Sequence, residues 1–143
     1  MRQNAPLPFL TALGAVSSVM MRSPIYCQYP VACLAEWIRP AILLGQYQLF
    51  HDHGENLVGY MTWALLSKEV EERLIHDPAL LLHISEWNEG ERLWVMDFVV
   101  LNQDVRRFVR VARERLKEYR QAKSLRRCED GVVRKTVIWR LNA

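Results

Sequence analysis

The sequence predicts a single α+β domain, residues 1–143, in which a mostly antiparallel, twisted sheet carries helices on its faces. Three observations lead to this prediction. Apolar residues recur at helical spacing in several segments. Short runs rich in β-branched and aromatic residues, bounded by turn residues, lie between these segments. The resulting order is helix, helix, hairpin, helix, strand, helix, hairpin, which is typical of α+β domains.

Two helices are expected first. Residues 9–21 are small and apolar, and Pro24 ends their helix because proline disfavours helix in the residue before it. The second helix covers VACLAEWI, residues 31–38. Pro30 suits its first turn, and Pro40 is expected to stop it.

A hairpin and a third helix follow. LLGQYQLF (43–50) and LVGYMTWALL (57–66) are predicted strands joined by the polar turn HDHGEN. Ser67 can cap a short helix, SKEVEERLIHD, whose early glutamates suit a helix N-terminus. Residues 79–84 are predicted as a further short helix or a strand.

The last part contains the longest predicted helix. Asn102 is its expected N-cap, and apolar residues keep helical spacing over residues 103–121. Two short strands, 124–128 and 132–140, close the chain around the turn Asp130-Gly131.

Composition narrows the class of protein. Half of the residues are hydrophobic and 24% are charged, as in ordinary globular domains. The net charge is only +3, but residues 102–127 hold ten Lys or Arg against three Asp or Glu, so the rest of the chain is net negative. No apolar run reaches the length of a membrane-spanning helix. The first residues lack an A-x-A cleavage site, which favours an ordinary helix over a signal peptide.

The cysteines and histidines suggest no metal site. Cys27, Cys33 and Cys128 form no C-x-x-C pair, so we expect free thiols in a reducing cytoplasm, each packed as a small buried hydrophobe. His51 and His53 form an H-x-H pair, but no third ligand stands at a recognisable spacing. We therefore predict neither a metal nor a cofactor.

A carboxylate stands in the middle of the strand RLWVMDFVVL, residues 92–101. Burying a charge is costly unless the group is paired or hydrogen-bonded. Alternate strand residues share a face, so Asp97 is expected beside Leu93, Val95, Val99 and Leu101. Two interpretations stay open at this point. Asp97 pairs with a buried arginine or with backbone N–H groups, or it handles protons in a reaction.

Four blocks of sequence point to a known family. They are SPIYCQYPV (23–31), PAILLGQYQLF (40–50), LVGYMTWALLS (57–67) and GERLWVMDFVV (90–100). In this order and spacing they resemble the toxin-activating lysine acyltransferases, the companions of RTX toxins. The closing segment SLRRCEDGVVRKTVIWR also resembles the family's last hairpin. The resemblance covers nearly the whole chain from about residue 13.

The resemblance implies a fold and a reaction. The fold is similar to that of the GNAT acetyltransferases. The reaction transfers a fatty acyl chain from acyl carrier protein to the side-chain amine of a lysine in a protein or peptide. Members of the family tend to dimerise, which we carry over as an expectation. The chain ends soon after the last hairpin, where typical members continue with a helical tail, so it resembles a short, divergent member.

The family's catalytic pair is a histidine in an S-P-x-H block and the aspartate of a W-x-x-D block. Ser23 matches the family's serine and Asp97 its aspartate, but Tyr26 stands at the histidine position. That departure puts the reaction in question. The alternative is an altered or inactive member that binds acyl carrier protein, a lipid or another partner.

The chemistry assigns each of these residues a candidate role. A lysine amine must lose a proton before it attacks a thioester. Tyrosine has a pKa of about 10, so Tyr26 suits a hydrogen-bond donor to the thioester carbonyl or a general acid; otherwise it only fills the histidine's space. Asp97 either orients a base or takes the lysine proton itself, and Ser23 contacts the thioester or orders the pair. Cys27 could carry an acyl group only with an activating base, which the sequence does not identify.

Substrate-binding candidates follow. Trp63 and Trp94 either belong to the core or wall an acyl channel. Arg106, Arg107 and Arg110 either form a solvated face or dock the acidic acyl carrier protein. Nucleic acid is less favoured, because no recognition module is visible. The joint VVLNQDVRR lacks the glycine with which GNAT enzymes cradle the coenzyme A pyrophosphate, which agrees with a carrier protein as donor.

Overall fold

The computed structural model describes residues 7–77, 81–127 and 133–141. Its helices and strands follow the predicted order. The helices are α1 (Phe9–Arg22), α2 (Arg39–Leu43), α3 (Lys68–His76) and α4 (Val105–Arg115), with short helical turns η1 (Tyr26–Gln28), η2 (Leu34–Ile38) and η3 (Ile84–Trp87). The strands are β1 (Tyr47–His51), β2 (Leu57–Leu66), β3 (Arg92–Val100), β4 (Gln121–Arg127) and β5 (Val133–Arg140).

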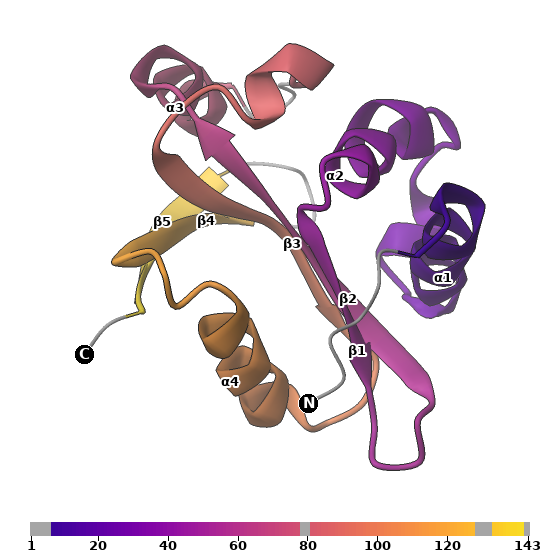
Figure 1. Ribbon diagram of the computed structural model, residues 1–143. Coiled ribbons are helices and arrows are strands. Elements are labelled where there is room, and N and C mark those ends of the chain that lie inside the picture. Colours follow the sequence, from indigo (N-terminus) through magenta and orange to yellow (C-terminus); the bar gives the residue numbers. More distant parts are fainter. Residues whose placement is uncertain (1–6, 78–80, 128–132, 142–143) are drawn as a thin grey trace.

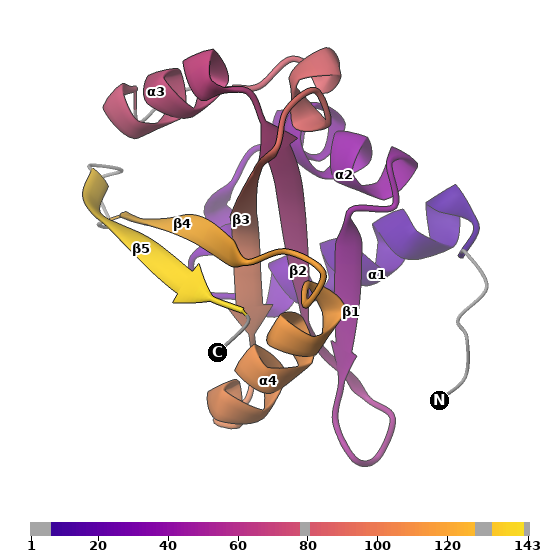
Figure 2. The same ribbon diagram turned by 60° about the vertical axis from the view of Figure 1, so that its left-hand side comes forward.

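The five strands form one sheet in the order β1-β2-β3-β4-β5. Three neighbouring pairs are antiparallel, and β3 and β4 are parallel because α4 connects them. The parallel pairing has one matched position, Trp94 opposite Lys123, and β4 and β5 turn away from the other strands (Figure 2). The prediction of an α+β domain with a mostly antiparallel sheet is confirmed.

Helices cover both faces of the sheet (Figure 1). One face carries α1, η2 and α2, and further along the strands α3 and η3. The other face carries α4, whose buried side chains are Phe108, Ala112 and Leu116. The α1 side buries Val16 and Val19. Each amphipathic helix thus removes its apolar stripe from water against the sheet.

Local sequence signals account for several boundaries. Ser67 caps α3, since its side chain accepts a hydrogen bond from the backbone N–H of Val70 at 3.2 Å. Strand β2 covers the predicted residues 57–66. The predicted turn at Asp130-Gly131 lies outside the described residues, as do residues 78–80 and Cys128.

Several boundary predictions are wrong, and among them the strand predicted from residue 124 begins at Gln121. Pro40 does not stop a helix but lies in the first turn of α2, where its missing N–H would have no partner in any case. Strand β1 begins at Tyr47 rather than residue 43, because α2 runs to Leu43 and Gly45 turns the chain with a φ of +68°. Helix α4 is shorter than predicted.

The start of α4 also differs. Asp104, not Asn102, holds the N-cap position, and no side chain caps the helix. The Asn102 side chain instead accepts a hydrogen bond from the backbone N–H of Asp104 at 3.0 Å, an Asx-type turn before the helix.

Candidate functional site

A β-bulge in β3 determines where the central carboxylate lies. Thr62 on β2 is opposite Asp97, but the next residue of β2, Trp63, is opposite Val95. Met96 is therefore the extra residue of a bulge. Bulges reorient side chains and are frequent next to active sites.

The bulge corrects the predicted neighbours of Asp97. Leu93 and Val95 pack in the cluster under α4, whereas Val99 and Leu101 pack in the cluster under α1. Strict alternation would have placed all four beside Asp97. Because the bulge breaks the alternation, Asp97 faces the α1 side with Val99 and Leu101 only.

Three neutral groups donate hydrogen bonds to the Asp97 carboxylate. The Tyr26 hydroxyl donates to Oδ1 at 3.1 Å. The Trp37 indole N–H and the Thr62 hydroxyl both donate to Oδ2, at 2.7 and 2.8 Å. Asp97 is only 5% exposed. The partners are neither a buried arginine nor backbone N–H groups, so the structural interpretation in its predicted form is wrong.

Burial changes the proton affinities of the Tyr26–Asp97 pair. Removal from water raises the pKa of Asp97 above its ordinary value, although its three hydrogen bonds act in the opposite direction. Burial also raises the pKa of Tyr26 well above its ordinary value, and the negative charge of Asp97 adds to this effect. Tyr26 therefore keeps its proton at neutral pH and acts as a donor, while Asp97 is the group able to accept a proton.

Ser23 holds the turn that carries Tyr26. Its side chain is buried and accepts a hydrogen bond from the Tyr26 backbone N–H at 3.2 Å. Its carbonyl oxygen accepts one from the Cys27 backbone N–H at 3.0 Å. These bonds follow α1 directly and form η1, so Ser23 orders the pair through the backbone of Tyr26.

Trp37 and Thr62 were missed by the sequence reasoning. Trp37 lies on η2, a π-helical turn inside the segment that was predicted as a regular helix. Such turns are frequent at functional sites. Thr62 offered a weak signal, since it is the one aliphatic hydroxyl among the otherwise apolar and aromatic residues of β2.

The two tryptophans proposed for an acyl channel lie on opposite faces of the sheet. Trp63 is buried under α4, and the Arg115 guanidinium lies 4.8 Å from its ring. Trp94 is buried in the cluster under α3. The structure therefore does not bring the two rings together around one channel.

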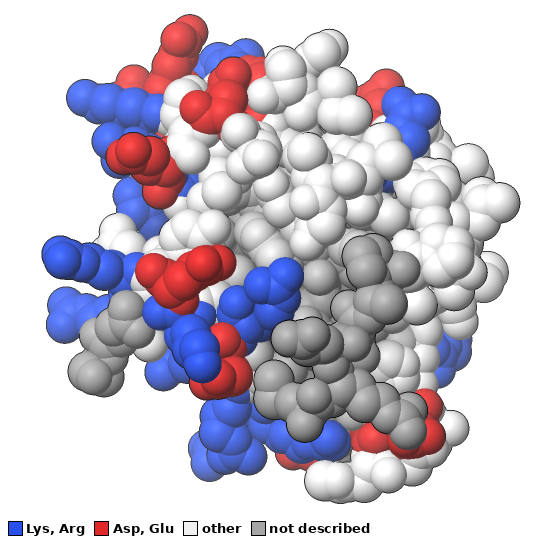
Figure 3. All heavy atoms as spheres, in the orientation of Figure 1, with Lys and Arg blue, Asp and Glu red and all other residues white. Residues whose placement is uncertain are grey.

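The candidate arginines lie on α4, across the sheet from Asp97. Arg106 and Arg110 are exposed, whereas Arg107 is half-buried with its guanidinium 5.0 Å from the Phe108 ring. Figure 3 shows positive side chains gathered on the side of the molecule that holds α4 and the β4–β5 hairpin. These arginines form a separate surface from the Tyr26–Asp97 pair.

The remaining candidate residues are two cysteines and two histidines outside the hydrogen-bonded Tyr26–Asp97 pair. Cys27 is exposed and Cys33 is half-buried, which corrects their predicted burial. The Cys27 thiol donates to the Pro24 carbonyl oxygen at 3.5 Å. His51 and His53 are exposed. Among the described residues, no three His, Cys, Asp or Glu side chains are grouped as metal ligands would be. Nor does the described part of the chain contain a helix with the length and apolar character needed to cross a bilayer.

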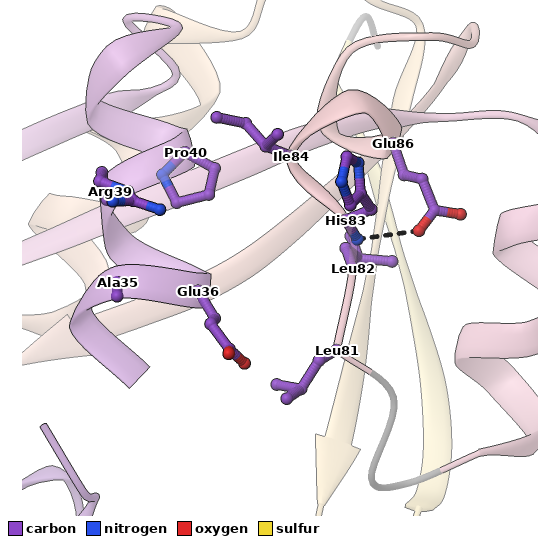
Figure 4. Close-up of a pocket in the computed structure, with 9 residues that line it drawn as sticks. All are labelled: Ala35, Glu36, Arg39, Pro40, Leu81, Leu82, His83, Ile84 and Glu86. Carbon is purple, nitrogen blue, oxygen red and sulfur yellow. Dashed lines mark hydrogen bonds between the residues drawn. The ribbon is translucent and has the colours of Figure 1, made fainter. Parts of the chain in front are cut away.

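A hollow of about 370 Å³ lies between two helical segments of the chain (Figure 4). It separates the η2–α2 segment from the segment before and within η3. Its lining is mixed: apolar side chains alternate with charged and polar ones, and the residues are Ala35, Glu36, Arg39, Pro40, Leu81, Leu82, His83, Ile84 and Glu86. The hollow shares η2 with Trp37 but not the carboxylate site itself.

Comparison with known proteins provides independent evidence. The chain is 34% identical over 99 residues to the protein-lysine myristoyltransferase HlyC of Escherichia coli, covering 69% of this chain and 55% of that protein. It is 34% identical over 94 residues to the protein-lysine palmitoyltransferase CyaC of Bordetella bronchiseptica, covering 66% and 50%. An uncharacterized protein of Synechocystis is 28% identical over 123 residues, covering 85% and 83%. The chain spans about half the length of the two acyltransferases.

A solved structure supports the fold. The loading GNATL domain of CurA from Lyngbya majuscula superposes with a TM-score of 0.56 at 12% identity, covering 85% of this chain and 63% of that one. The GNAT-like fold is thereby confirmed. The family model for RTX toxin acyltransferases matches residues 5–140, nearly the whole sequence. The chain therefore belongs to the RTX toxin acyltransferase family.

Proposed function

We propose that this chain transfers a fatty acyl group from an acyl carrier protein to the side-chain amine of a lysine in a protein or peptide. The observation that carries the proposal is the hydrogen bond from Tyr26 to Asp97. The two residues meet although 71 positions separate them, and they occupy the places of the pair that the family resemblance implies. The relatives named above are protein-lysine acyltransferases.

The geometry supports a proton relay. The Tyr26 hydroxyl donates its hydrogen to Asp97 Oδ1, while its lone pairs can accept a hydrogen bond. A lysine ammonium passes a proton to the Tyr26 oxygen as the Tyr26 hydrogen moves to Asp97. The products are a neutral lysine amine, a neutral Tyr26 and a protonated Asp97. This route never forms the phenolate that burial opposes.

The neutral amine then attacks the carbonyl carbon of the thioester. A C–N bond forms, the C–S bond breaks, and the second amine proton goes to the departing thiolate. Asp97 finally releases its proton to solvent. The relay thus performs the deprotonation for which the family uses histidine, with Asp97 as the proton acceptor.

The α4 surface supports an acidic carrier protein as donor. Arg106, Arg110 and Arg113 are exposed and follow one another by about one helical turn each. None of the three forms an ion pair with any described residue. A row of exposed cations attracts an acidic partner and raises its association rate.

The proposal extends to location and assembly. Free thiols such as Cys27 and Cys33 suit the reducing cytoplasm. The family resemblance supports a homodimer. No metal or further cofactor takes part in the proposed reaction.

One observation favours a second candidate, a binding protein without catalysis. Asp97 is nearly buried, and all three of its partners are donors of this chain. The tyrosine at the family's histidine position would then account for a loss of acyl transfer. In this case the same surfaces would hold an acyl carrier protein, a lipid or another partner.

The test uses purified protein, acyl carrier protein with a labelled fatty acyl chain, and a lysine-bearing protein acceptor. We expect transfer by the native protein and a decrease of about 10²–10⁴-fold in Asp97→Asn, the range typical of a lost proton acceptor. Tyr26→Phe should also lose transfer, and Tyr26→His should retain it. Asp52→Asn, in the β1–β2 turn, is the matched control and should behave as the native protein.

Two results would decide against the proposal. If the native protein is inactive but Tyr26→His transfers the acyl group, the chain is a binding protein. If Asp97→Asn transfers as fast as Asp52→Asn, the proton relay is wrong.

A further inference from the structure

Four large apolar side chains are exposed around the turn that carries Tyr26. They are Met21 (72% exposed), Ile25 (63%), Tyr29 (48%) and Val31 (79%), and we name them the apolar rim. Residues 23–35 contain no charged side chain. Grouped exposed apolar surface is unusual on a monomeric protein and indicates an interaction site.

The apolar rim adjoins the candidate catalytic pair through Tyr29. The rings of Tyr26 and Tyr29 lie 4.9 Å apart, and the Tyr29 backbone N–H donates to the Tyr26 carbonyl oxygen at 3.1 Å. Ile25 directly precedes Tyr26 in the same turn. Tyr29 therefore joins the exposed rim to the ring whose hydroxyl lies at Asp97.

Two other candidate places suit an alkyl chain less well. Trp63 and Trp94 are buried in separate clusters on opposite faces of the sheet. The hollow in Figure 4 is lined by the charged side chains of Glu36, Arg39 and Glu86 among apolar ones. An alkyl chain gains most where it covers apolar surface without desolvating charges.

The charge distribution agrees with an apolar occupant. Figure 3 shows that the side of the molecule over α1 and α2 carries few charged side chains, in contrast to the α4 side. Arg22, the charged residue next to the rim, donates through its guanidinium to the Leu57 carbonyl oxygen at 2.8 Å and to the Ser18 carbonyl oxygen at 3.3 Å. The rim thus presents apolar atoms next to the site at which the thioester would react.

We propose that the fatty acyl chain of the donor lies along the apolar rim, and that Ile25 and Val31 determine the preference for long chains. The inference rests on the proposed acyl transfer and replaces the channel between Trp63 and Trp94 with a surface track. We assign the rim to the alkyl chain of the donor; binding of a second copy of the protein is the competing outcome.

The test compares myristoyl and butyryl donors on the same carrier protein. Ile25→Ser and Val31→Ser should each lower kcat/KM for the myristoyl donor about fivefold to tenfold, since each removes most of a covered aliphatic side chain. The butyryl donor, too short to cover the rim, should react as with the native protein. Both positions are exposed, so the fold should tolerate serine.

Leu10→Ser is the matched control. Leu10 is 76% exposed on α1 but lies more than two helical turns from the rim. It should leave both donors unaffected. If Leu10→Ser lowers the myristoyl rate as much as the rim variants do, or if the rim variants keep the native chain-length preference, the inference is wrong.

Two further readouts separate the other outcomes. If the rim variants change the oligomeric state in size-exclusion chromatography and keep the chain-length preference, the rim binds a second copy and the inference is overturned. If the native protein transfers nothing, the proposed function fails, and binding of a fluorescent long-chain acyl-pantetheine decides the inference. Weaker binding in the rim variants than in Leu10→Ser supports the acyl track; equal binding refutes it.

Discussion

At the scale of single residues, the central feature is a carboxylate held by neutral donors. No cation among the described residues pairs with Asp97; instead a phenol, an indole and a hydroxyl share its two oxygens. This arrangement leaves the carboxylate with a raised proton affinity while keeping it oriented. Both properties suit a group that must take a proton and later release it.

Trp37 should set the pH dependence of the reaction. Its indole N–H stabilises the charged carboxylate, so Trp37→Phe should raise the pKa of Asp97 further. The acid limb of the kcat/KM profile should then move to higher pH. Trp87→Phe is the control, since the Trp87 indole N–H has no hydrogen-bond partner among the described residues. An equal shift in both variants would assign the effect to lost packing.

Asp97 should also affect stability in a pH-dependent way. Because its pKa is raised by folding, the folded state binds this proton more tightly than the unfolded state. Stability from this group is therefore highest at low pH and falls as pH rises above about 4. Asn does not titrate, so the free energy of unfolding of the native protein minus that of Asp97→Asn should decline with rising pH. Urea denaturation across pH measures this difference; a difference that grows with pH would contradict the prediction.

At the scale of elements, two irregularities build the site. The bulge at Met96 turns Asp97 toward the α1 side, and the π-turn η2 places Trp37 over the same carboxylate. A regular strand would direct Asp97 differently. The site therefore depends on local departures from ideal geometry, which are common at functional positions.

An ion-pair network fixes the weakly paired junction of β3 and β4. Glu71 of α3 is buried and pairs with Lys123 of β4 and, at 3.1 Å, with Arg92 of β3. Lys123 is also the residue matched to Trp94 in the parallel pairing, and its ammonium lies 5.9 Å from that ring. One carboxylate thus connects a helix with both strands where the sheet has its fewest matched positions.

Glu71→Gln should lower the free energy of unfolding by about 1–3 kcal/mol, because it removes the anion shared by both cations. Glu114→Gln is the matched control. Its partner is Lys117, and both side chains are well exposed, so the loss should be much smaller than for Glu71→Gln. Urea denaturation of both variants measures the two values. Equal losses would show that the buried network contributes no more than a surface pair.

At the scale of the whole molecule, the charges are segregated. Positive side chains gather on the side of α4 and the β4–β5 hairpin, and the side over α1 and α2 is largely uncharged (Figure 3). This division suits a donor with two unlike parts. An acidic carrier would meet α4, and its apolar chain would meet the opposite surface.

Removing charge from α4 should weaken binding of the carrier protein. The double variant Arg106→Gln, Arg110→Gln should raise KM for the acyl carrier donor several-fold at low salt. The difference from the native protein should shrink as salt is added, because screening weakens the native attraction. Arg39→Gln, an exposed arginine beside the hollow of Figure 4, is the control. A salt-independent effect would argue against electrostatic docking.

The sequence by itself determined the order of elements and the candidate pair. Helical and alternating periodicity depend on local side-chain patterns, so α1, β2 and α3 could be predicted closely. A carboxylate in an apolar strand is costly anywhere in a core, so Asp97 was identifiable before any contact was known. The matching blocks added Tyr26 and Ser23.

Only the tertiary structure decided what surrounds that carboxylate. A bulge arises from the pairing of two strands, so its position at Met96 and the resulting face of Asp97 have no signal within β3 alone. Trp37 reaches Asp97 across 60 positions through a π-turn that helical periodicity does not reveal. Trp63 and Trp94 could not be assigned to opposite faces until the register was known. Local patterns identify which residues are buried, but long-range pairing determines which of them meet.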